Sequence, residues 1–351
     1  MGRLSIMWVR RKAVIAGAAA VVAVALAVSL ILVFTGGRPK PTAHAVAAPA
    51  PSATPKPTPA VCPARVSPFT GEPVKSMGPV LAAKIDNIIY ARPQTGLTEA
   101  DTIYVLPVEG GLSRFLAIFS SHFPPVIGPV RSARFDDLAL LRQFGTPAFA
   151  WSGAQPKLQR KVERARIVDL FDGLVGGYFR SASRAAPDNL YASTRVLLRE
   201  AGGRESRAHC IGFQFGPAPR GGRTATSVSV SYPAASFKFV WSHRLQHWLV
   251  WMDGARAAST EGPQLSAATV VIQHTVVRTS RYLEEDRRPP YAETIGHGWA
   301  LVLRNGRAFR VQWSRPKANR GTTFTYRGKP FTFAKGQVWV VLVGNRRAEA
   351  N

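Results

Sequence analysis

The chain has few cysteines and few acidic residues. Cys62 and Cys210 are the only cysteines among 351 residues, so at most one disulfide can form within the chain. The 20 aspartate and glutamate residues face 46 lysine and arginine residues, which gives a formal net charge of +26 at pH 7. A positive field of this size attracts anionic polymers and anionic membrane surfaces, but it does not determine a fold.

Several motifs that identify large functional classes are also missing. The sequence contains neither the Gly-x-Gly-x-x-Gly pattern of dinucleotide-binding proteins nor a Walker pattern. The histidines at 243, 247, 274 and 297 have no carboxylate at metal-ligand spacing. None of the usual nucleic-acid-binding motifs is present. We therefore predict no cofactor, no metal site and no specific nucleic-acid partner.

One long segment near the N-terminus contains no charged residue. Residues 13–34 are apolar apart from the hydroxyl group of Ser29, and about 20 apolar residues suffice to cross a lipid bilayer as a helix. Four basic residues lie within residues 1–12, and basic residues at a membrane boundary stay on the cytoplasmic side. We predict a single transmembrane helix over 13–35, with residues 1–12 in the cytoplasm and the rest of the chain outside the cell membrane.

A proline-rich segment follows the predicted helix. Residues 36–61 contain seven prolines, separated mainly by Ala, Thr and Lys, and such a composition cannot bury a core. We predict a disordered linker that spans up to roughly 80 Å when extended. Small residues around Ala43 and Ala45 also offer a cleavage site, so a cleaved signal peptide remains an alternative to the anchor.

The first half of the remaining chain alternates between strand and helix patterns. Short apolar runs predict strands, and apolar residues on one face predict a helix at Phe135–Phe144. A basic helix is expected at Gln155–Arg166, and another helix at Ser193–Ala201, ended by two glycines. Strands separated by helices are typical of an α/β domain. We predict such a domain with a mixed sheet over 62–219. The expected strands are 80–85, 102–108, 114–120 and 146–151, with a short extended stretch at 168–171.

The second half reads almost entirely as strands. Glycines, prolines and arginines at 216–223 mark a boundary, and hairpin signals such as Asn305-Gly306 follow it. We predict a small, mostly antiparallel β-domain over 220–345, and hence an α+β protein overall. The tryptophans of this half are expected in its core, although stacking on sugar rings is an alternative.

The segment from Val80 to Arg134 is the most informative part of the sequence. Its acidic and basic residues lie at the ends of predicted strands, where an open α/β sheet places its ligands. Arginine forks bind carboxylate or phosphate groups, so we predict an anion site here. Alternatively, the arginines pair with the acids and hold turns together. The residues concerned are Arg92, Arg114, Arg131, Arg134, Asp86, Asp101 and Glu109.

Two chemical alternatives involve catalysis. Asp86 and Glu109 are weak candidates for a pair of carboxylates that cleave a glycosidic bond, which requires one acid and one base or nucleophile across an open cleft. His209 and Cys210 are adjacent, so on an extended chain their side chains point to opposite faces and do not form a nucleophilic pair. A wall-polymer hydrolase that uses Asp86 and Glu109 is the alternative to a binding protein.

The motifs of this segment resemble those of the YerB-like family of extracytoplasmic proteins. The resemblance implies an N-terminal and a C-terminal domain and supplies no activity. On this resemblance, the predicted ligand site also includes Gln94, Ser132, Asn189 and Tyr191, in addition to the four arginines. Asp188 departs from the family pattern, in which we expect a histidine. The matching residues are 67–71, 85–87, 91–94, 108–111, 129–134, 186–191, 269–274, 296–298 and 313–343.

The resemblance also bears on the cysteines, because the family is mostly described as lipoproteins. The residues before Cys62 do not form a lipobox, so we expect a Cys62–Cys210 disulfide rather than lipidation of Cys62. Taken together, the sequence predicts a membrane-anchored protein of the cell envelope. Its expected role is binding or scaffolding, with an anionic wall polymer or membrane ligand as the partner.

Overall fold

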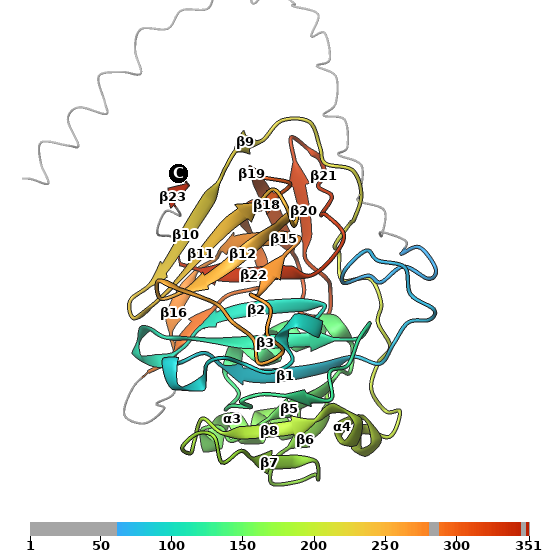
Figure 1. Cartoon of the computed structure of the whole chain (residues 1–351). Coiled ribbons are helices and arrows are strands. Elements are labelled where there is room, and N and C mark those ends of the chain that lie inside the picture. Colours follow the sequence, from blue (N-terminus) through green and yellow to red (C-terminus); the bar gives the residue numbers. More distant parts are fainter. Residues whose placement is uncertain (1–61, 281–287, 345–348, 351) are drawn as a thin grey trace, which may run out of the picture. The chain divides into compact units, whose positions relative to one another are not determined.

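The computed structural model describes residues 62–280, 288–344 and 349–350. These residues belong to one compact unit, and most of their regular structure is β (Figure 1). The predicted cytoplasmic segment, transmembrane helix and linker lie outside the described residues. Within the described ranges, no helix is both long enough and apolar enough to cross a membrane.

A twelve-stranded mixed sheet forms the framework. Its central strands are buried on both faces, which explains their nearly continuous apolar sequences. From one edge to the other the order is β21 (Lys329–Pro330), β20 (Thr323–Tyr326), β19 (Arg307–Arg315), β18 (Gly296–Arg304), β15 (Thr269–His274), β22 (Val338–Val343), β2 (Thr102–Pro107), β3 (Ser113–Phe119), β1 (Leu81–Asp86), β5 (Ala148–Trp151) and β6 (Val168–Phe171), with β9 (Arg223–Thr224) beside β19. Parallel pairs join β1 to β5, β5 to β6, β2 to β22 and β15 to β22, and the other pairs are antiparallel.

A smaller sheet packs against this framework. Phe237 lies 6.1 Å from Phe115 of β3, and Phe239 lies 6.1 Å from Trp339 of β22, measured between ring centroids. Strand β12 (His247–Met252) also contacts β15 and β18, so the two sheets enclose one aromatic core. The strands of the smaller sheet are β13 (Ala255–Arg256), β12 (His247–Met252), β11 (Ala235–Ser242), β10 (Ser227–Tyr232), β23 (Glu349–Ala350) and β14 (Ser266–Ala267).

Short helices cover the first half of the large sheet. Helices α2 (Phe135–Leu141) and α3 (Pro156–Glu163) bury Leu140, Leu141, Leu158 and Val162 in one core cluster, whereas α4 (Thr194–Ala201) buries Leu197 and Ala201 in the other. The remaining elements are the one-turn helices η1 (Ile89–Ala91), η2 (Leu97–Glu99), η3 (Glu109–Gly111) and η4 (Arg142–Phe144), the sheet of β4 (Val126–Ile127), β7 (Tyr178–Arg180) and β8 (Leu190–Ser193), and the hairpin of β16 (Val277–Thr279) and β17 (Pro290–Ala292).

The predicted mixed sheet is present, but the second half of the chain extends it. Strand β22 pairs in parallel with β2 from the first half and with β15 from the second. The predicted domains 62–219 and 220–345 therefore share one sheet, whereas the sequence suggested a small antiparallel sheet for the second. The domain boundary itself stays a prediction. Trp241, Trp248, Trp313 and Trp339 lie in the core, as predicted, whereas Trp251 and Trp299 are only partly buried.

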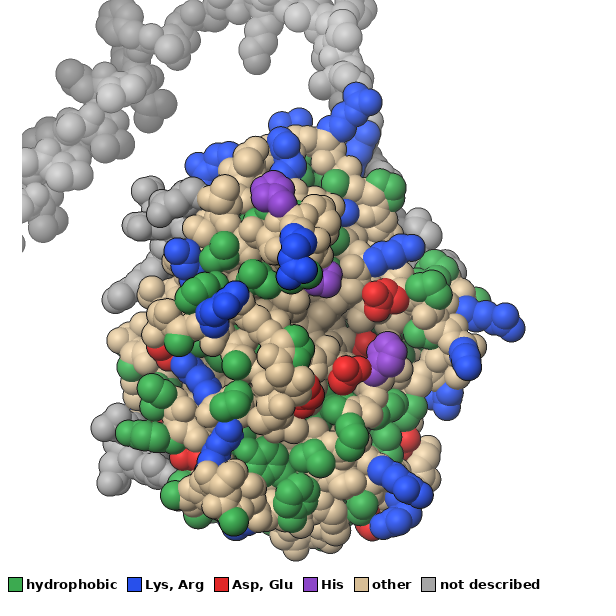
Figure 2. All heavy atoms as spheres, in the orientation of Figure 1, with side chains coloured by type: hydrophobic (Ala, Val, Ile, Leu, Met, Phe, Trp, Pro, Cys, Tyr) green, Lys and Arg blue, Asp and Glu red, His purple; other side chains and the backbone are tan. Residues whose placement is uncertain are grey.

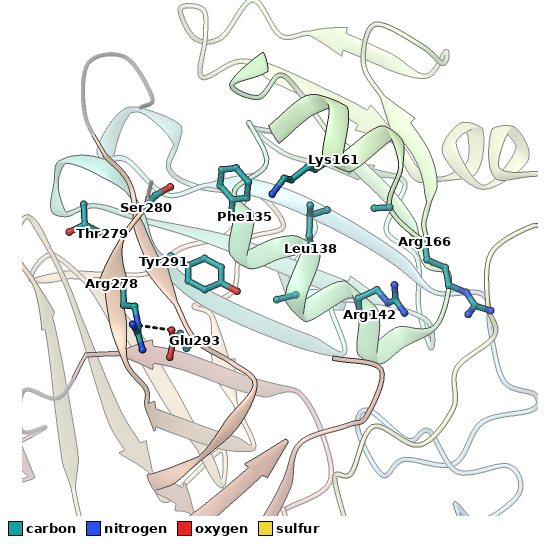
Figure 3. Close-up of a pocket in the computed structure, with 12 residues that line it drawn as sticks. Phe135, Leu138, Arg142, Lys161, Arg166, Arg278, Thr279, Ser280, Tyr291 and Glu293 are labelled. Carbon is teal, nitrogen blue, oxygen red and sulfur yellow. Dashed lines mark ion pairs between the residues drawn. The ribbon is translucent and has the colours of Figure 1, made fainter. Parts of the chain in front are cut away.

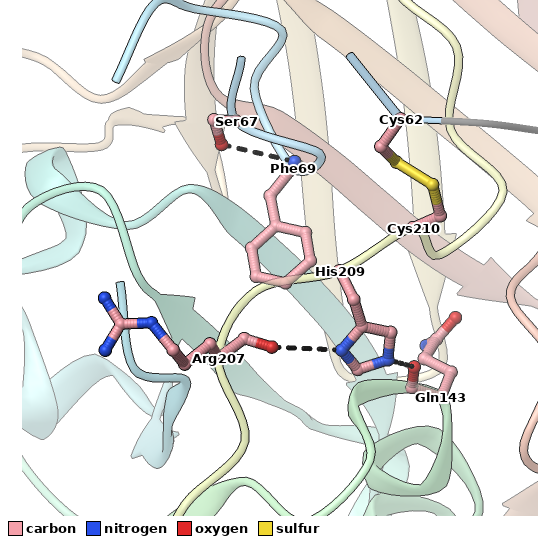
Figure 4. The surroundings of a disulfide bond; sticks show 7 residues. All are labelled: Cys62, Ser67, Phe69, Gln143, Arg207, His209 and Cys210. Atoms are coloured by element: carbon pink, nitrogen blue, oxygen red, sulfur yellow. Dashed lines mark hydrogen bonds between the residues drawn. A yellow bond between two sulfur atoms is a disulfide. The ribbon is translucent and has the colours of Figure 1, made fainter. Parts of the chain in front are cut away.

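A disulfide joins the start of the described chain to the segment after α4. Cys62 and Cys210 are bonded, with their Cα atoms 5.7 Å apart (Figure 4). The neighbouring His209 ring contacts the backbone oxygens of Arg207 and Gln143 at 3.1 and 3.2 Å. The thiol of Cys210 is therefore engaged in a covalent bond, and the imidazole next to it contacts the backbone.

Candidate functional site

The predicted site lies where β1 ends and β3 begins. Strand β5 pairs only with the first half of β1, and the segment 129–131 takes its place beside the second half. The amide of Asp86 donates to the oxygen of Pro129 at 2.9 Å, and the amide of Arg131 donates to the oxygen of Lys84 at 2.8 Å. On the other side, Asp86 lies directly opposite Arg114 in the β1–β3 register. Backbone pairing thus brings one carboxylate between two arginines.

Asp86 is the centre of this arrangement. Its side chain is fully buried, and its Oδ2 accepts a hydrogen bond from the Nε of Arg131 at 2.5 Å. Its Oδ1 accepts from the amide of Asn87 at 2.7 Å and lies 3.7 Å from the Nε of Arg114. A buried carboxylate needs such partners, because a buried charge without them is very costly.

Glu109 forms the second carboxylate centre, at the one-turn helix η3. Arg134 donates to both of its carboxylate oxygens, and the Nη2 of Arg114 lies 3.3 Å from its Oε1. Burial by itself raises the pKa of Glu109, but the hydrogen bonds and charge of Arg134, with the charge of Arg114, lower it to about 2. Glu109 is therefore a permanently charged partner of two arginines at neutral pH.

Arg114 links the two carboxylates and is itself buried. Burial and the charge of Arg134 lower its pKa to about 10, although Asp86 and Glu109 oppose the shift. At neutral pH it stays charged. We call the set of Asp86, Glu109, Asp188, Arg114, Arg131 and Arg134 the arginine site; it contains three carboxylates and three guanidinium groups.

A buried ion pair between Lys84 and Asp137 helps to position Arg134. The Nζ of Lys84 donates to the Oδ1 of Asp137 at 2.7 Å, and both side chains are fully buried. The other carboxylate oxygen of Asp137 accepts from the amide of Arg134 at 2.6 Å, which caps α2. Burial lowers the pKa of Lys84, although the charge of Asp137 opposes this. The pair connects β1 to α2 and so positions Arg134 over Glu109.

Arg92 and Gln94 hold the backbone beside the arginine site, and Gln94 donates to the backbone oxygen of Asp86 at 3.1 Å. Arg92 donates to the backbone oxygen of Asn87 at 2.7 Å and forms an ion pair of 2.8 Å with Asp253 from the second half of the chain. Gln94 is buried and donates to the side-chain oxygen of Asn87 at 2.9 Å. Both residues hold the loop that follows β1, and Asn87 is their shared acceptor.

Asn189 and Tyr191 organise the β7–β8 hairpin. Asn189 accepts from Arg180 at 2.8 Å and donates to the backbone oxygens of Ser181 and Arg184 at 3.1 Å. The hydroxyl of Tyr191 accepts from Arg184 at 2.8 Å. Their side chains thus shape the loop that contains Asp188 rather than contacting the arginine site.

Two groups of the arginine site retain unused hydrogen-bonding capacity. Among the described residues, the terminal nitrogens of Arg131 have no hydrogen-bond partner; the nearest carboxylate oxygen to its Nη2 is Oδ1 of Asp188 at 3.8 Å. That oxygen is buried and has no hydrogen-bond partner among the described residues either. The side chain of Arg131 is 23% exposed, more than those of Arg114 and Arg134, so Arg131 is the most solvent-accessible of the three arginines.

The geometry does not support a pair of catalytic carboxylates. A glycosidase needs one protonated acid at its working pH, whereas the pKa of Glu109 is held at about 2. Asp86 is fully buried and engaged at both oxygens. In the part of the chain that the structure describes, no group of three or more His, Cys, Asp or Glu side chains is arranged to hold a metal ion.

Lys84, Asn87 and Asp137 also support this region, although no sequence motif predicted these roles. A signal existed for Lys84, because a lysine within a continuous apolar strand is buried only when it has a partner. Asp137, three residues after Arg134, is spaced as a helix-capping acid. Asp101, which was singled out with the site acids, instead accepts from the amides of Ser120 and Ser121.

Comparison with known proteins places this geometry in a family context. The sequence model described as "Protein of unknown function (DUF3048) N-terminal domain" matches residues 69–207, and the model described as its C-terminal domain matches residues 228–340. The arginine site lies entirely within the first range.

A relative and a solved structure agree with these matches. The chain is 26% identical over 296 residues to a Bacillus subtilis (strain 168) protein named "Putative lipoprotein YerB", covering 79% of this chain and 86% of that protein. A crystal structure of YerB protein from Bacillus subtilis superimposes with a TM-score of 0.70 at 22% identity, covering 79% of this chain and 96% of that one. The structural likeness establishes a shared fold.

Proposed function

We propose that this chain, which belongs to the DUF3048 family, is a membrane-associated extracytoplasmic protein that binds an anionic, hydroxyl-bearing group of a cell-envelope polymer. The name of the Bacillus subtilis relative supports the location, as does the uncharged segment 13–34 behind basic residues. Binding rather than catalysis is the proposed activity, because the carboxylates of the arginine site serve as ion-pair partners.

The observation that carries the proposal is the open side of Arg131. Its Nε is held by Asp86, which orients the guanidinium group and leaves the terminal nitrogens toward partly exposed space. Two such nitrogens match the paired oxygens of a phosphate or carboxylate. Since the side chain is already fixed, little conformational entropy is lost when a ligand binds.

Asp188 adds a requirement to the ligand. Its Oδ1 is buried without a hydrogen-bond partner among the described residues, and it lies 3.8 Å from the Nη2 of Arg131. A ligand that places an anionic oxygen on Arg131 and a hydroxyl group on Asp188 satisfies both groups at once. Glycerol phosphate and ribitol phosphate units, and acidic sugars of wall polymers, have this combination.

Net positive charge alone does not account for such binding. In Figure 2 the Lys and Arg side chains are spread over the visible face, with acidic side chains among them. A highly basic protein attracts any polyanion, so a polymer is a poor first probe. Small ligands with one phosphate group separate site binding from this general attraction.

The experiment compares glycerol 3-phosphate with methyl phosphate by calorimetric titration of the unit from Thr58 onward. We expect saturable binding of glycerol 3-phosphate, and weaker binding of methyl phosphate because it lacks the hydroxyl donor. In the Asp188→Ala variant the two ligands should bind alike. No saturable binding of either ligand, or an unchanged preference in Asp188→Ala, would refute the proposed recognition.

A further inference from the structure

A separate cavity lies between α2, the end of α3 and the β16–β17 hairpin (Figure 3). Its volume is about 610 Å³, within the range of about 300–1,000 Å³ that is usual for small-molecule sites. It shares no residue with the arginine site. We call it the α2–α3 cavity.

The floor of the α2–α3 cavity is apolar. Phe135 and Leu138 of α2 and Ala165 after α3 line it, and Tyr291 of β17 faces α2 across it. Leu138 and Ala165 are partly exposed rather than buried, so they present apolar surface to the cavity. The hydroxyl of Tyr291 has no hydrogen bond to another described residue. Burial is the main reason that the pKa of Tyr291 is raised.

The rim of the cavity is basic. Arg142, Lys161 and Arg166 line it from the α2–α3 side, and Arg278 lines it from the hairpin. Arg278 is neutralised by an ion pair of 2.6 Å with Glu293. The Nε of Arg142 is buried and has no hydrogen-bond partner among the described residues, and such an unsatisfied donor normally acquires a partner. The net positive charge of the rim therefore lies on the α2–α3 side, where Arg142, Lys161 and Arg166 are.

An apolar floor beneath a cationic rim selects one class of ligand. The floor excludes a fully hydrated anion, because covering apolar surface with a charged group gains nothing. The rim disfavours a neutral hydrocarbon, since desolvating arginine without a counter-charge is costly. A molecule with an apolar body and one anionic head satisfies both.

We propose that the α2–α3 cavity binds an anionic amphiphile, with its phosphate or carboxylate head on Arg142 and Arg166 and its apolar body against Leu138 and Ala165. The cavity is too small for a diacyl lipid and suits a single chain of moderate length. This inference does not depend on the arginine site, since it concerns other residues and another ligand.

The test measures binding of dodecyl phosphate below its micelle concentration, with dodecanoate, dodecyl maltoside and inorganic phosphate as comparison ligands. Comparing dodecyl phosphate with dodecanoate shows whether the site prefers a phosphate or a carboxylate head on the same tail. We expect dodecyl phosphate or dodecanoate to bind with one saturable site. Dodecyl maltoside lacks the charge and inorganic phosphate lacks the tail, so each should bind at least about tenfold more weakly.

Variants assign the binding to the cavity. Arg142→Gln with Arg166→Gln should weaken amphiphile binding about tenfold, and Ala165→Phe should weaken it by filling the floor. Arg160→Gln with Arg164→Gln is the matched control, because it removes two charges near α3 that do not line the cavity.

The melting temperature of every variant is recorded, so that loss of binding can be distinguished from loss of folding. Loss of binding in the cavity variants at an unchanged melting temperature supports the inference. Equal loss in the control pair would mean that overall charge is responsible. Unchanged binding in both cavity variants, or equal affinity for dodecyl maltoside, would overturn it.

Discussion

The three arginines of the arginine site differ in burial and in the number of their ion-pair partners. Arg134 is bound to Glu109 through both carboxylate oxygens, and Arg114 bridges two carboxylates while almost fully buried. Arg131 combines an Nε held by Asp86 with a side chain that is more exposed than those of the other two arginines. The sequence allowed the arginines to be either structural or ligand-binding; Arg114 and Arg134 form ion pairs with the site carboxylates, and ligand binding by Arg131 is our proposal.

The lowered pKa of Glu109 predicts that its contribution to the stability of the fold depends on pH. Its folded value of about 2 lies below its ordinary value of 4.5, so its ion pairs stabilise the fold above pH 4.5, and this stabilisation is lost as the pH falls toward 2. We expect Glu109→Gln to remove about 1–2 kcal/mol of unfolding free energy at pH 7, after allowance for its partial exposure, and almost none near pH 2.

Urea denaturation of both proteins at pH 2.5, 4 and 7 measures this difference. Asp172→Asn serves as the matched control, since burial raises rather than lowers the pKa of Asp172. A stability difference between wild type and Glu109→Gln that stays constant from pH 7 to pH 2.5 would contradict the assignment of Glu109 as an ion-pair partner.

At the scale of elements, the pattern of apolar residues was sufficient for most strands and helices. The predicted strands at 80–85, 102–108 and 114–120 correspond to β1, β2 and β3, because short, nearly continuous apolar runs are typical of strands that are buried on both faces. The β7–β8 hairpin was missed, since Tyr178–Arg180 is short and largely exposed. Its position is set by hydrogen bonds from Asn189 and Arg184, which no local periodicity reveals.

The disulfide connects elements that are 148 residues apart in sequence. Such a cross-link stabilises mainly by restricting the unfolded chain, typically by about 2–4 kcal/mol. We expect Cys62→Ser with Cys210→Ser to lower the unfolding free energy by this amount under oxidising conditions. Under reducing conditions the wild type and the double variant should become equally stable.

Chemical denaturation with and without dithiothreitol makes this comparison. Ser183→Ala, an exposed substitution in another loop, is the control for solvent effects of the reductant. If the double variant is as stable as the oxidised wild type, the bond does not contribute to folding as described.

At the scale of the whole molecule, the sheet crosses the boundary that composition suggested. The glycine and proline run at 216–223 separates two sequence patterns, but β22 returns to pair with β2. This long-range pairing could not be predicted, because an apolar strand such as Val338–Val343 fits equally well into either sheet. The resemblance to a two-domain family was confirmed, yet it carries no information about which strands are neighbours.

The shared sheet predicts that residues 62–219 do not fold alone. Without β22, the fully buried strand β2 would expose an apolar edge to water, and such an edge promotes aggregation. We expect the fragment to lack near-ultraviolet circular dichroism, and the unit from Thr58 onward to unfold in one transition by both fluorescence and circular dichroism. A soluble fragment with native dichroism would contradict this account.

The central claim is that Arg131 binds the ligand while Arg134 supports the fold. Lysine replacements test it most directly, because they retain the charge beside Asp86 or Glu109 and remove the guanidinium fork. Glycerol 3-phosphate affinity and melting temperature should be measured together on Arg131→Lys and Arg134→Lys. We predict that Arg131→Lys weakens binding about tenfold with little change in melting temperature, whereas Arg134→Lys lowers the melting temperature and leaves the affinity of the folded protein nearly intact. Wild-type affinity in Arg131→Lys would contradict the account.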